Sequence, residues 1–154
     1  MITPVTQALD AAGVPYRLFK HPGEVHSVEQ AAKERGMQID QIIRSIVFRV
    51  ASDYFVMVLI AGTRQVSWPL LRKYLSQSRL TMASEEEVLE VTGYHLGAVS
   101  PFGLSAPMQI LIDQSVMGFE EISIGSGVRN TAVILRSFDL LQALDPVEIV
   151  QFAS

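Results

Sequence analysis

The strongest constraint on the fold is a pair of apolar runs separated by only three residues. The run "QIIRSIVFRV" covers 41–50, and "YFVMVLIAG" covers 54–62. Both are rich in β-branched and aromatic residues, which are typical of strands. The intervening "ASD" is long enough only for a turn, so the two runs predict a β-hairpin. An antiparallel pair in mid-chain does not fit a sheet whose strands are all parallel.

Shorter elements are predicted on both sides of this hairpin. Capping residues and closing glycines predict helices over 4–12, from the Ser27–Gln30 capping box to Gly36, and over 68–75, 85–91 and 139–144. Asp145-Pro146 would begin a final short helix. Further strands are predicted at 16–19, 79–82, 108–113, 119–125 and 130–136. Hairpins and short helices favour a single α+β domain over residues 1–154, with a mixed, mostly antiparallel sheet flanked by short helices.

Composition excludes several classes of protein. The 154 residues include no cysteine, which excludes disulfides, thiolate zinc sites and cysteine nucleophiles. No signal peptide is evident at the N-terminus, and no apolar run approaches the ~20 residues of a membrane span. We therefore expect a cytoplasmic protein with no membrane partner.

Charge is unevenly distributed along the chain. The net charge is −4, but residues 1–79 carry ten Lys/Arg against six Asp/Glu, and residues 80–154 carry two against ten. This asymmetry allows a basic face on an acidic protein. The charges could equally mix in space, and the sequence leaves both possibilities open.

The polar residues do not form a recognisable nucleophilic or metal site. His21, His26 and His95 have no spacing typical of metal ligands, and no G-x-S-x-G motif is present. The segment "GSGVRN" is glycine-rich, but it joins two predicted strands and opens no helix. A hairpin turn is therefore its simplest interpretation, and we expect no metal and no cofactor.

Arg44 interrupts the first strand of the central hairpin. The strand period of two places it on the same face as Ile46, Phe48 and Val50. If that face is buried, the guanidinium needs an anionic partner or a polar cavity. Alternatively, the side chain reaches water from the strand end.

The segment "TGYHLGAVSPFGL", residues 92–104, is apolar and rich in glycine. Gly93 can close the preceding helix, while Gly97 and Gly103 allow backbone conformations that side chains forbid. Free N–H groups near Gly97 could bind a carbonyl or an oxyanion. An apolar loop that covers an edge of the core would explain the same composition.

These pieces, in this order, resemble a known family. The segment Gly97–Pro101 resembles the glycine-x-x-x-proline loop of the YbaK/ProX aminoacyl-tRNA deacylase domain. It is preceded by "HPGEVHSVEQAA" and by "QIIRSIVFR", where the family has a lysine-bearing strand. It is followed by "ILIDQSV", which contains Asp113, and by "ISIGSGVRNTAVIL". The resemblance covers roughly residues 4–145, and it implies a partly barrel-like sheet.

The resemblance also implies a function. Such domains hydrolyse the ester that joins a wrong amino acid to the 3′ end of tRNA, with no protein nucleophile. Backbone N–H groups of Gly97 and Ala98 would hold the substrate carbonyl, and a substrate ribose hydroxyl would assist the attacking water. The substrate pocket would comprise His26, Val28, Ile46, Ser100, Pro101, Asp113, Ser126, Gly127 and Asn130. The partners implied are mischarged tRNA and possibly an aminoacyl-tRNA synthetase, but not DNA. Contacts with tRNA would come from Arg17, Lys20, Arg44, Arg72 and Lys73.

The sequence departs from the family pattern at the central strand. Arg44, which the resemblance places with Gly97 and Ala98 among the catalytic residues, stands where the family usually has lysine. The positive charge is kept but cannot be lost by deprotonation. Ser45 and "GVRN" stand where an alanine-specific subgroup has Asn and a His-Pro-x-x-Asn piece, so only Asn130 is retained. A non-catalytic module that binds a tRNA end or a nucleotide is the alternative function.

Overall fold

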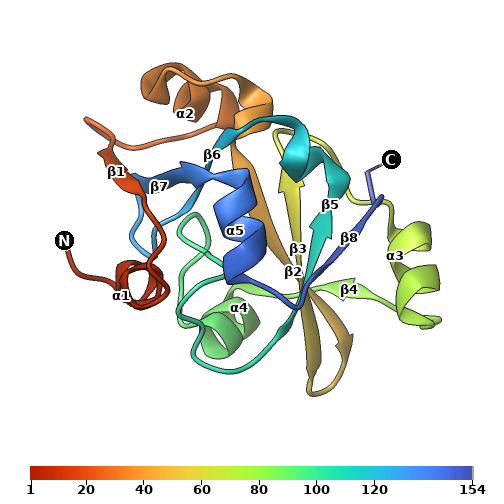
Figure 1. Cartoon of the computed structure of the whole chain (residues 1–154). Helices are drawn as coiled ribbons and strands as arrows, with labels where there is room; N and C mark the ends of the chain where they lie inside the picture. The colour runs from red at the N-terminus through yellow and green to blue at the C-terminus, as the bar shows by residue number, and fades with distance from the viewer. Residues whose placement is uncertain (154) are drawn as a thin grey trace.

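The computed structural model describes residues 1–153 and contains two β-sheets (Figure 1). Ser154, the last residue of the predicted domain, lies outside the described residues. The three-stranded sheet has the order β1 (Arg17–Lys20), β7 (Thr131–Arg136), β6 (Glu121–Gly125). The five-stranded sheet has the order β4 (Thr81–Met82), β2 (Ile43–Ala51), β3 (Tyr54–Ala61), β5 (Gln109–Asp113), β8 (Glu148–Val150). A single parallel bridge between Ile42 and Ser123 joins them.

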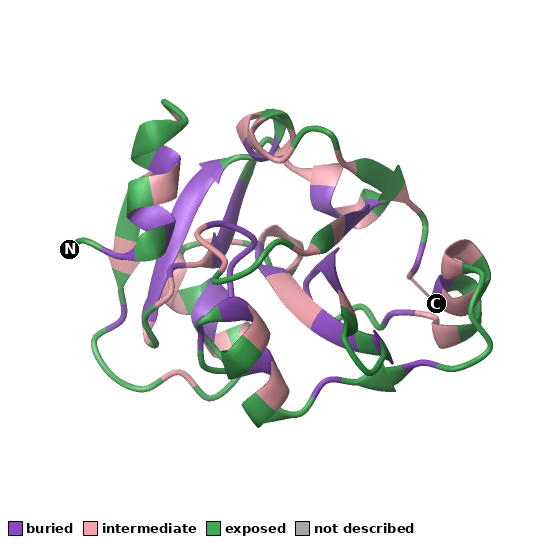
Figure 2. Ribbon diagram, turned by 90° about the horizontal axis from the view of Figure 1, so that it is seen from below, coloured by how far each residue is buried: buried purple, intermediate pink, exposed green. Residues whose placement is uncertain are grey.

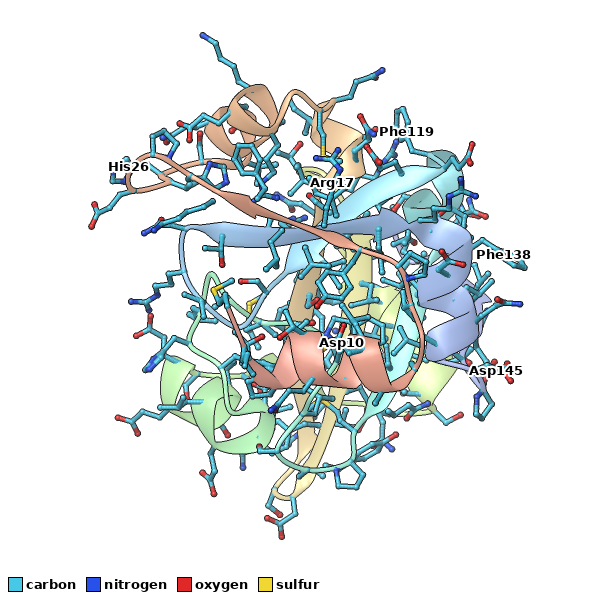
Figure 3. All side chains as sticks on the ribbon, turned by 60° about the vertical axis from the view of Figure 1, so that its left-hand side comes forward. Asp10, Arg17, His26, Phe119, Phe138 and Asp145 are labelled. Carbon is cyan, nitrogen blue, oxygen red and sulfur yellow. The ribbon has the colours of Figure 1, made fainter. Side chains whose placement is uncertain are left out.

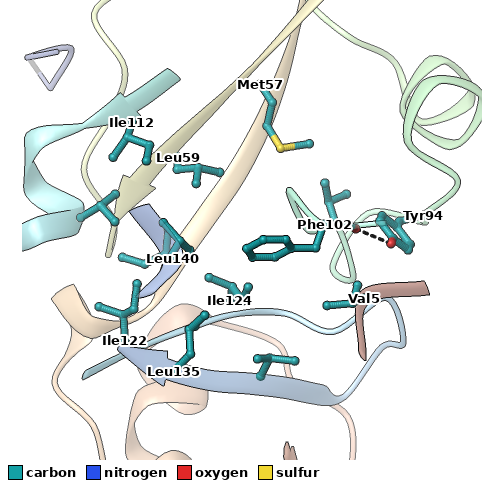
Figure 4. Close-up of a cluster of buried hydrophobic side chains, with 14 of the residues drawn as sticks. Val5, Met57, Leu59, Tyr94, Phe102, Ile112, Ile122, Ile124, Leu135 and Leu140 are labelled. Carbon is teal, nitrogen blue, oxygen red and sulfur yellow. Dashed lines mark hydrogen bonds between the residues drawn. The ribbon is translucent and has the colours of Figure 1, made fainter. Parts of the chain in front are cut away.

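The predicted hairpin, β2–β3, is the centre of the fold because both of its faces are buried. One face contributes Ile43, Val47, Met57 and Leu59 to a core cluster between the two sheets. The other contributes Phe48 and further residues to a second cluster, closed by helix α3 (Trp68–Leu75) and Phe152. Burial on both faces explains why the two runs are almost continuously apolar. Figure 2 shows this buried interior beneath exposed helices and loops, and Figure 4 shows the first cluster.

The remaining helices cover the outside of the sheets. They are α1 (Pro4–Ala11), α2 (Val28–Arg35), α4 (Glu85–Thr92) and α5 (Ser137–Ala143), with 3₁₀ turns at Ile39–Gln41 and Gln114–Gly118. Ser84 and Glu87 cap α4 reciprocally, as their spacing predicts. Ser27 accepts from the Gln30 N–H at 3.0 Å, but the Gln30 Oε1 accepts from His26 N–H rather than from Ser27. Among the described helices, none is both long and apolar enough to cross a membrane.

Two details of the expected architecture need correction. The α+β class and the mostly antiparallel pairing are confirmed, since only β3–β5 and β5–β8 are parallel. The sheets do not close into a barrel, because in residues 1–153 the Ile42–Ser123 bridge is the only strand pairing between them. The helix expected from Asp145-Pro146 is wrong. That segment leads into β8, which pairs with β5 from Leu111–Glu148 to Asp113–Val150, and this long-range pairing overrides the local helix-start signal.

Candidate functional site

A cavity of about 620 Å³ lies between α2, the start of β2, the glycine-rich loop and the β6–β7 hairpin. Its wall is mostly apolar, with a few polar groups, which is the usual character of a small-molecule site. Three arginines also line it, Arg35, Arg44 and Arg129. The other lining residues are Val25, Ser27, Val28, Ala31, Ile42, Ile43, Ser45, Ile46, Glu85, Leu96, Gly97, Val99, Ile124, Gly125, Asn130 and Thr131.

The glycine-rich loop is held in a defined shape by its own hydrogen bonds. The Tyr94 hydroxyl donates to the carbonyl oxygens of Phe102 (2.6 Å) and Gly103 (3.0 Å), and Figure 4 shows the first of these contacts. Burial raises the pKa of Tyr94 to about 12, so the hydroxyl keeps its proton. Gly97 has φ +89°, in the left-handed region that favours glycine.

The two predicted carbonyl-binding residues differ in their surroundings. Gly97 lines the cavity, and within residues 1–153 its N–H has no hydrogen-bond acceptor. Ala98 is 2% exposed and lies off the wall. Its N–H donates to the His95 carbonyl at 3.0 Å, and its own carbonyl accepts from the Gly127 N–H at 3.0 Å. Val99 lines the cavity, and in the same part of the chain its N–H also has no acceptor.

The loop packs directly on strand β6 because Gly125 has no side chain. A Cβ at Gly125 would lie 2.8 Å from the Val99 carbonyl carbon and 3.0 Å from the Ala98 carbonyl oxygen. The close approach places Gly97 and Val99 over the cavity. Gly125 is therefore required by packing between loop and strand, although its backbone φ is not in the left-handed region.

Arg44 lies on the cavity wall, and its guanidinium is turned toward the strand ends. Its Nε donates to the Gly62 carbonyl at 2.6 Å, and its Nη2 donates to the Arg64 carbonyl. Partial burial lowers the pKa of Arg44, and backbone carbonyls rather than a carboxylate compensate for the lost water. The cation is thus available to the cavity while two of its donors are already used.

Ser45 is the neighbouring residue on the wall, and its side chain points to the opposite face of β2. Its Oγ is the one buried side-chain oxygen or nitrogen without a partner in the described part of the chain. A buried polar atom without a hydrogen bond costs stability, so such an atom in a native protein needs an explanation, and one explanation is a functional role. Ser45 is therefore a candidate for contact with a ligand.

A buried network holds the third cation at the C-terminal end of α2. Glu34 Oε1 and His21 Nδ1 are 2.7 Å apart, and His21 has no exposed side-chain surface. Arg35 Nε donates to His21 Nε2 at 3.0 Å, and Arg35 Nη1 donates to Ser123 Oγ at 2.8 Å. The network connects α2 with β6 through side chains 88 positions apart in the sequence.

Only some predicted pocket residues line the cavity. Val28, Ile46 and Asn130 do so, and the Asn130 Oδ1 also accepts from the Val25 N–H at 3.1 Å. His26 is exposed on the connection before α2 and points away from the body of the protein (Figure 3). The others do not line the cavity, namely Ser100, Pro101, Asp113, Ser126 and Gly127.

Asp113 and Ser126, two of the residues that do not line the cavity, form hydrogen bonds that stabilise the fold. Asp113 is fully buried, and its Oδ1 accepts from the N–H groups of Phe152 (2.6 Å) and Ala153 (3.0 Å). Its Oδ2 accepts from the Ser115 N–H at 3.0 Å. Ser126 is also fully buried, and its Oγ contacts Thr131 Oγ1 and accepts from the Val128 N–H. These bonds fix the C-terminal segment and the β6–β7 turn.

The cations predicted to contact tRNA do not form one surface. Arg17 and Lys20 lie on β1, whereas Arg72 and Lys73 lie in the last turn of α3, at the opposite side of the molecule in Figure 1. Arg17 also forms an ion pair with Glu121 at 3.1 Å. The cavity instead brings together Arg35, Arg44 and Arg129.

Sequence reasoning missed Arg35, Ser45 and Arg129. Arg35 ends a helix, where a cation is favourable on the exposed surface, and no local signal predicts its contact with Ser123. Arg129 follows the "GSG" turn, and its Nε donates to the Leu96 carbonyl at 3.0 Å. Ser45 had a signal, since a polar residue between Ile43 and Val47 interrupts a buried face.

Comparison with known proteins identifies the family of the chain. Residues 22–143 match the family described as "Aminoacyl-tRNA editing domain". YwhH of Bacillus subtilis, an uncharacterized protein, is 32% identical over 74% of this chain and 72% of its own length. The proline–tRNA ligase of Thermosipho melanesiensis is 32% identical over 74% of this chain, which spans only 20% of that ligase.

Two further relatives align along almost the whole chain. The multifunctional Ser/Thr-tRNA deacylase ProXp-y of Escherichia coli is 28% identical over 94% of this chain and 87% of its own. The crystal structure of a proposed trans-editing enzyme for prolyl-tRNA synthetase superposes with a TM-score of 0.89 at 24% identity, covering 100% and 99% of the two chains. The cavity and its loop are thus set in the expected fold, and the chain belongs to the aminoacyl-tRNA editing domain family, the YbaK/ProX group.

Proposed function

We propose that this chain is a trans-editing hydrolase that removes a wrong amino acid from tRNA. The observation that carries the proposal is the unbonded N–H of Gly97 on the cavity wall, set in a loop that resembles the family loop. The N–H would donate to the ester carbonyl oxygen as negative charge develops on that oxygen. Ala98 can add a second N–H only by leaving the His95 carbonyl, whereas the Val99 N–H makes no such bond.

The proposed chemistry needs no protein nucleophile. No histidine lines the cavity within residues 1–153, so the hydroxyls on its wall have no histidine base among the lining residues. Water would attack the ester with help from the adjacent ribose hydroxyl of the substrate. The deacylase activity named for ProXp-y, with the ligases among the relatives, supports a mischarged tRNA as substrate and a synthetase as partner.

The test is a deacylation time course over a panel of mischarged tRNAs, beginning with seryl- and threonyl-tRNA. Gly97→Ala keeps the backbone N–H but disfavours the φ of +89° that directs it. Turnover should fall by about a hundredfold or more, as when an oxyanion donor no longer reaches the carbonyl oxygen. Only the left-handed φ opposes the added methyl group, because its nearest neighbour is Arg129 Cγ at 4.0 Å, so the folding cost should be only about 1–2 kcal/mol. Gly23→Ala is the control, because a Cβ there meets no atom within 4 Å. Full turnover by Gly97→Ala would refute the loop mechanism.

A second function is favoured by the way Arg44 is held. By the resemblance, Arg44 stands in the place of a lysine, and its guanidinium already donates to the carbonyls of Gly62 and Arg64. The chain would then bind a tRNA end or a nucleotide without hydrolysing the ester. No turnover by the wild type on any mischarged tRNA, with turnover gained by Arg44→Lys, would establish this function. Clear wild-type turnover would exclude it.

A further inference from the structure

Arg35 is a cation on the cavity wall, and in the described part of the chain no carboxylate pairs with it. Its two hydrogen bonds go to neutral atoms, His21 Nε2 at 3.0 Å and Ser123 Oγ at 2.8 Å. Among residues 1–153 it makes no ion pair, although Glu34 is its neighbour in the chain. Burial lowers the pKa of Arg35 to about 10, and Glu34 opposes this shift, so the group stays charged at neutral pH.

The arrangement of Glu34 and His21 fixes the direction of Arg35. Guanidinium nitrogens can only donate, so His21 Nε2 must accept from Arg35 Nε. The ring hydrogen is therefore on Nδ1, where it donates to Glu34 Oε1 at 2.7 Å. Glu34 is fixed in turn by Gln30, whose Nε2 donates to Glu34 Oε2 at 2.8 Å. A side chain held in this way has already lost the freedom that binding would otherwise cost.

The bonds to His21 and Ser123 leave part of the guanidinium unused. A guanidinium carries five N–H donors, and these two bonds use one on Nε and one on Nη1. Within residues 1–153 the others have no acceptor, and Arg35 lines the cavity. Arg44 also has two donors in use, and both donate to backbone carbonyls. Arg35 differs in its partners, because side chains of a buried network hold it in one direction while its other three N–H groups are available to a ligand.

We propose that Arg35 binds an anionic oxygen group of the ligand, and that His21 and Glu34 position it for that purpose. A planar guanidinium offers paired N–H groups that match a phosphate or a carboxylate. With the proposed function, the anion is either a phosphodiester near the tRNA 3′ end or a side-chain carboxylate on the attached amino acid. The first test needs no hydrolysis, so it can succeed even if the proposed function fails.

The first experiment measures binding of adenosine 5′-monophosphate and of adenosine to the whole chain by NMR titration. The Arg35 Nε–H signal of the wild type, assigned with Arg35→Lys, should shift with the monophosphate and not with adenosine. Arg35→Gln should weaken monophosphate binding by about tenfold or more, as expected for one lost charge-assisted contact. Arg35→Lys should restore part of the affinity. Arg136→Gln is the control, because Arg136 is exposed and lies outside the cavity.

The second experiment distinguishes the two sources of the anion through deacylation kinetics. A phosphodiester contact predicts that Arg35→Gln raises the KM for seryl-tRNA and leaves hydrolysis of seryl-adenosine, which has no phosphate, unchanged. A carboxylate contact predicts instead a selective loss of activity on aspartyl-tRNA. Two results together would overturn the proposal. The Arg35 Nε–H signal would not shift when the monophosphate is added, and Arg35→Gln, shown to be folded by its melting curve, would hydrolyse every substrate with wild-type kinetics.

The positioning role of His21 has its own test. His21→Phe keeps a ring beside Phe19, whose centroid is 4.9 Å away, but removes the acceptor for Arg35 Nε. The affinity of His21→Phe for the monophosphate should be lower than that of the wild type. Its melting temperature should fall no more than that of Glu34→Gln, a comparison variant that keeps the His21 ring. Unchanged affinity in folded His21→Phe would show that Arg35 does not depend on His21.

Discussion

Gly125→Ala is the sharpest test of how the fold shapes the site. The new methyl group would lie 2.8 Å from the Val99 carbonyl carbon and still closer to its oxygen. Non-bonded carbon atoms approach to ~3.5 Å, so the loop must withdraw by at least about 0.7 Å. Gly97 and Val99 would move with it. Displacement of a catalytic group by about 1 Å can cost on the order of a hundredfold in rate.

Gly125→Ala should therefore lower kcat/KM by about ten- to a hundredfold in the deacylation assay. Overpacking of this kind should also lower the free energy of unfolding by about 1–3 kcal/mol, measured in urea. Gly118→Ala is the matched control, because its new methyl group meets no atom within 4 Å and its φ is not in the left-handed region. If Gly125→Ala kept wild-type stability and kcat/KM, the contact between loop and strand would not set the site geometry.

Three further substitutions separate structural from functional roles. Ser45→Ala removes a buried hydroxyl without a partner in the described residues, so the free energy of unfolding should be unchanged or rise by up to about 1 kcal/mol. A clear decrease in this free energy, measured by urea denaturation, would show that the Ser45 Oγ is hydrogen-bonded in the native protein. Asp113→Asn replaces one of the two carboxylate oxygens that accept from the N–H groups of Phe152, Ala153 and Ser115. The free energy of unfolding should fall by about 2–3 kcal/mol, and KM should be unchanged. A raised KM with unchanged stability would support the predicted substrate contact instead. Hydrogen bonds from Gln30 and then His21 lower the pKa of Glu34. The ionised carboxylate therefore stabilises the folded state above the ordinary glutamate pKa of ~4.3, and this stabilisation is lost as pH falls through the lower folded-state pKa. The melting temperature of Glu34→Gln should thus fall less steeply than that of the wild type on acidification, and parallel profiles would contradict this.

Local signals predicted the elements well because the interactions that define them are local. Helix α3 occupies the predicted 68–75, with Ser67 accepting from the Leu70 N–H. Ser84 begins α4 for the same reason, since its bond with Glu87 spans one turn. The family loop and the cavity residues Val28, Ile46 and Asn130 were also predictable, because they lie in segments with recognisable order.

Long-range contacts determine what the sequence did not reveal. Strand β8 forms only because β5 offers an edge, and nothing near Pro146 indicates that partner. Arg35 resembles any exposed helix-end cation until Ser123 and His21 are placed beside it. Asp113 is the last residue of the apolar strand β5, and the resemblance implies a contact between it and the substrate. In the structure its Oδ1 accepts from the N–H groups of Phe152 and Ala153.

The pairing of β1 has a consequence for the order of events during synthesis. Arg17 pairs with Ile134, 117 residues later, and among the described strands β1 pairs with β7 alone. While the ribosome extends the chain, residues 17–20 cannot pair until residues 131–136 have emerged. The Arg35–Ser123 contact likewise waits for residue 123. A nascent chain can close its central hairpin early, yet the wall of the cavity is completed only after β6 and β7 have been synthesised.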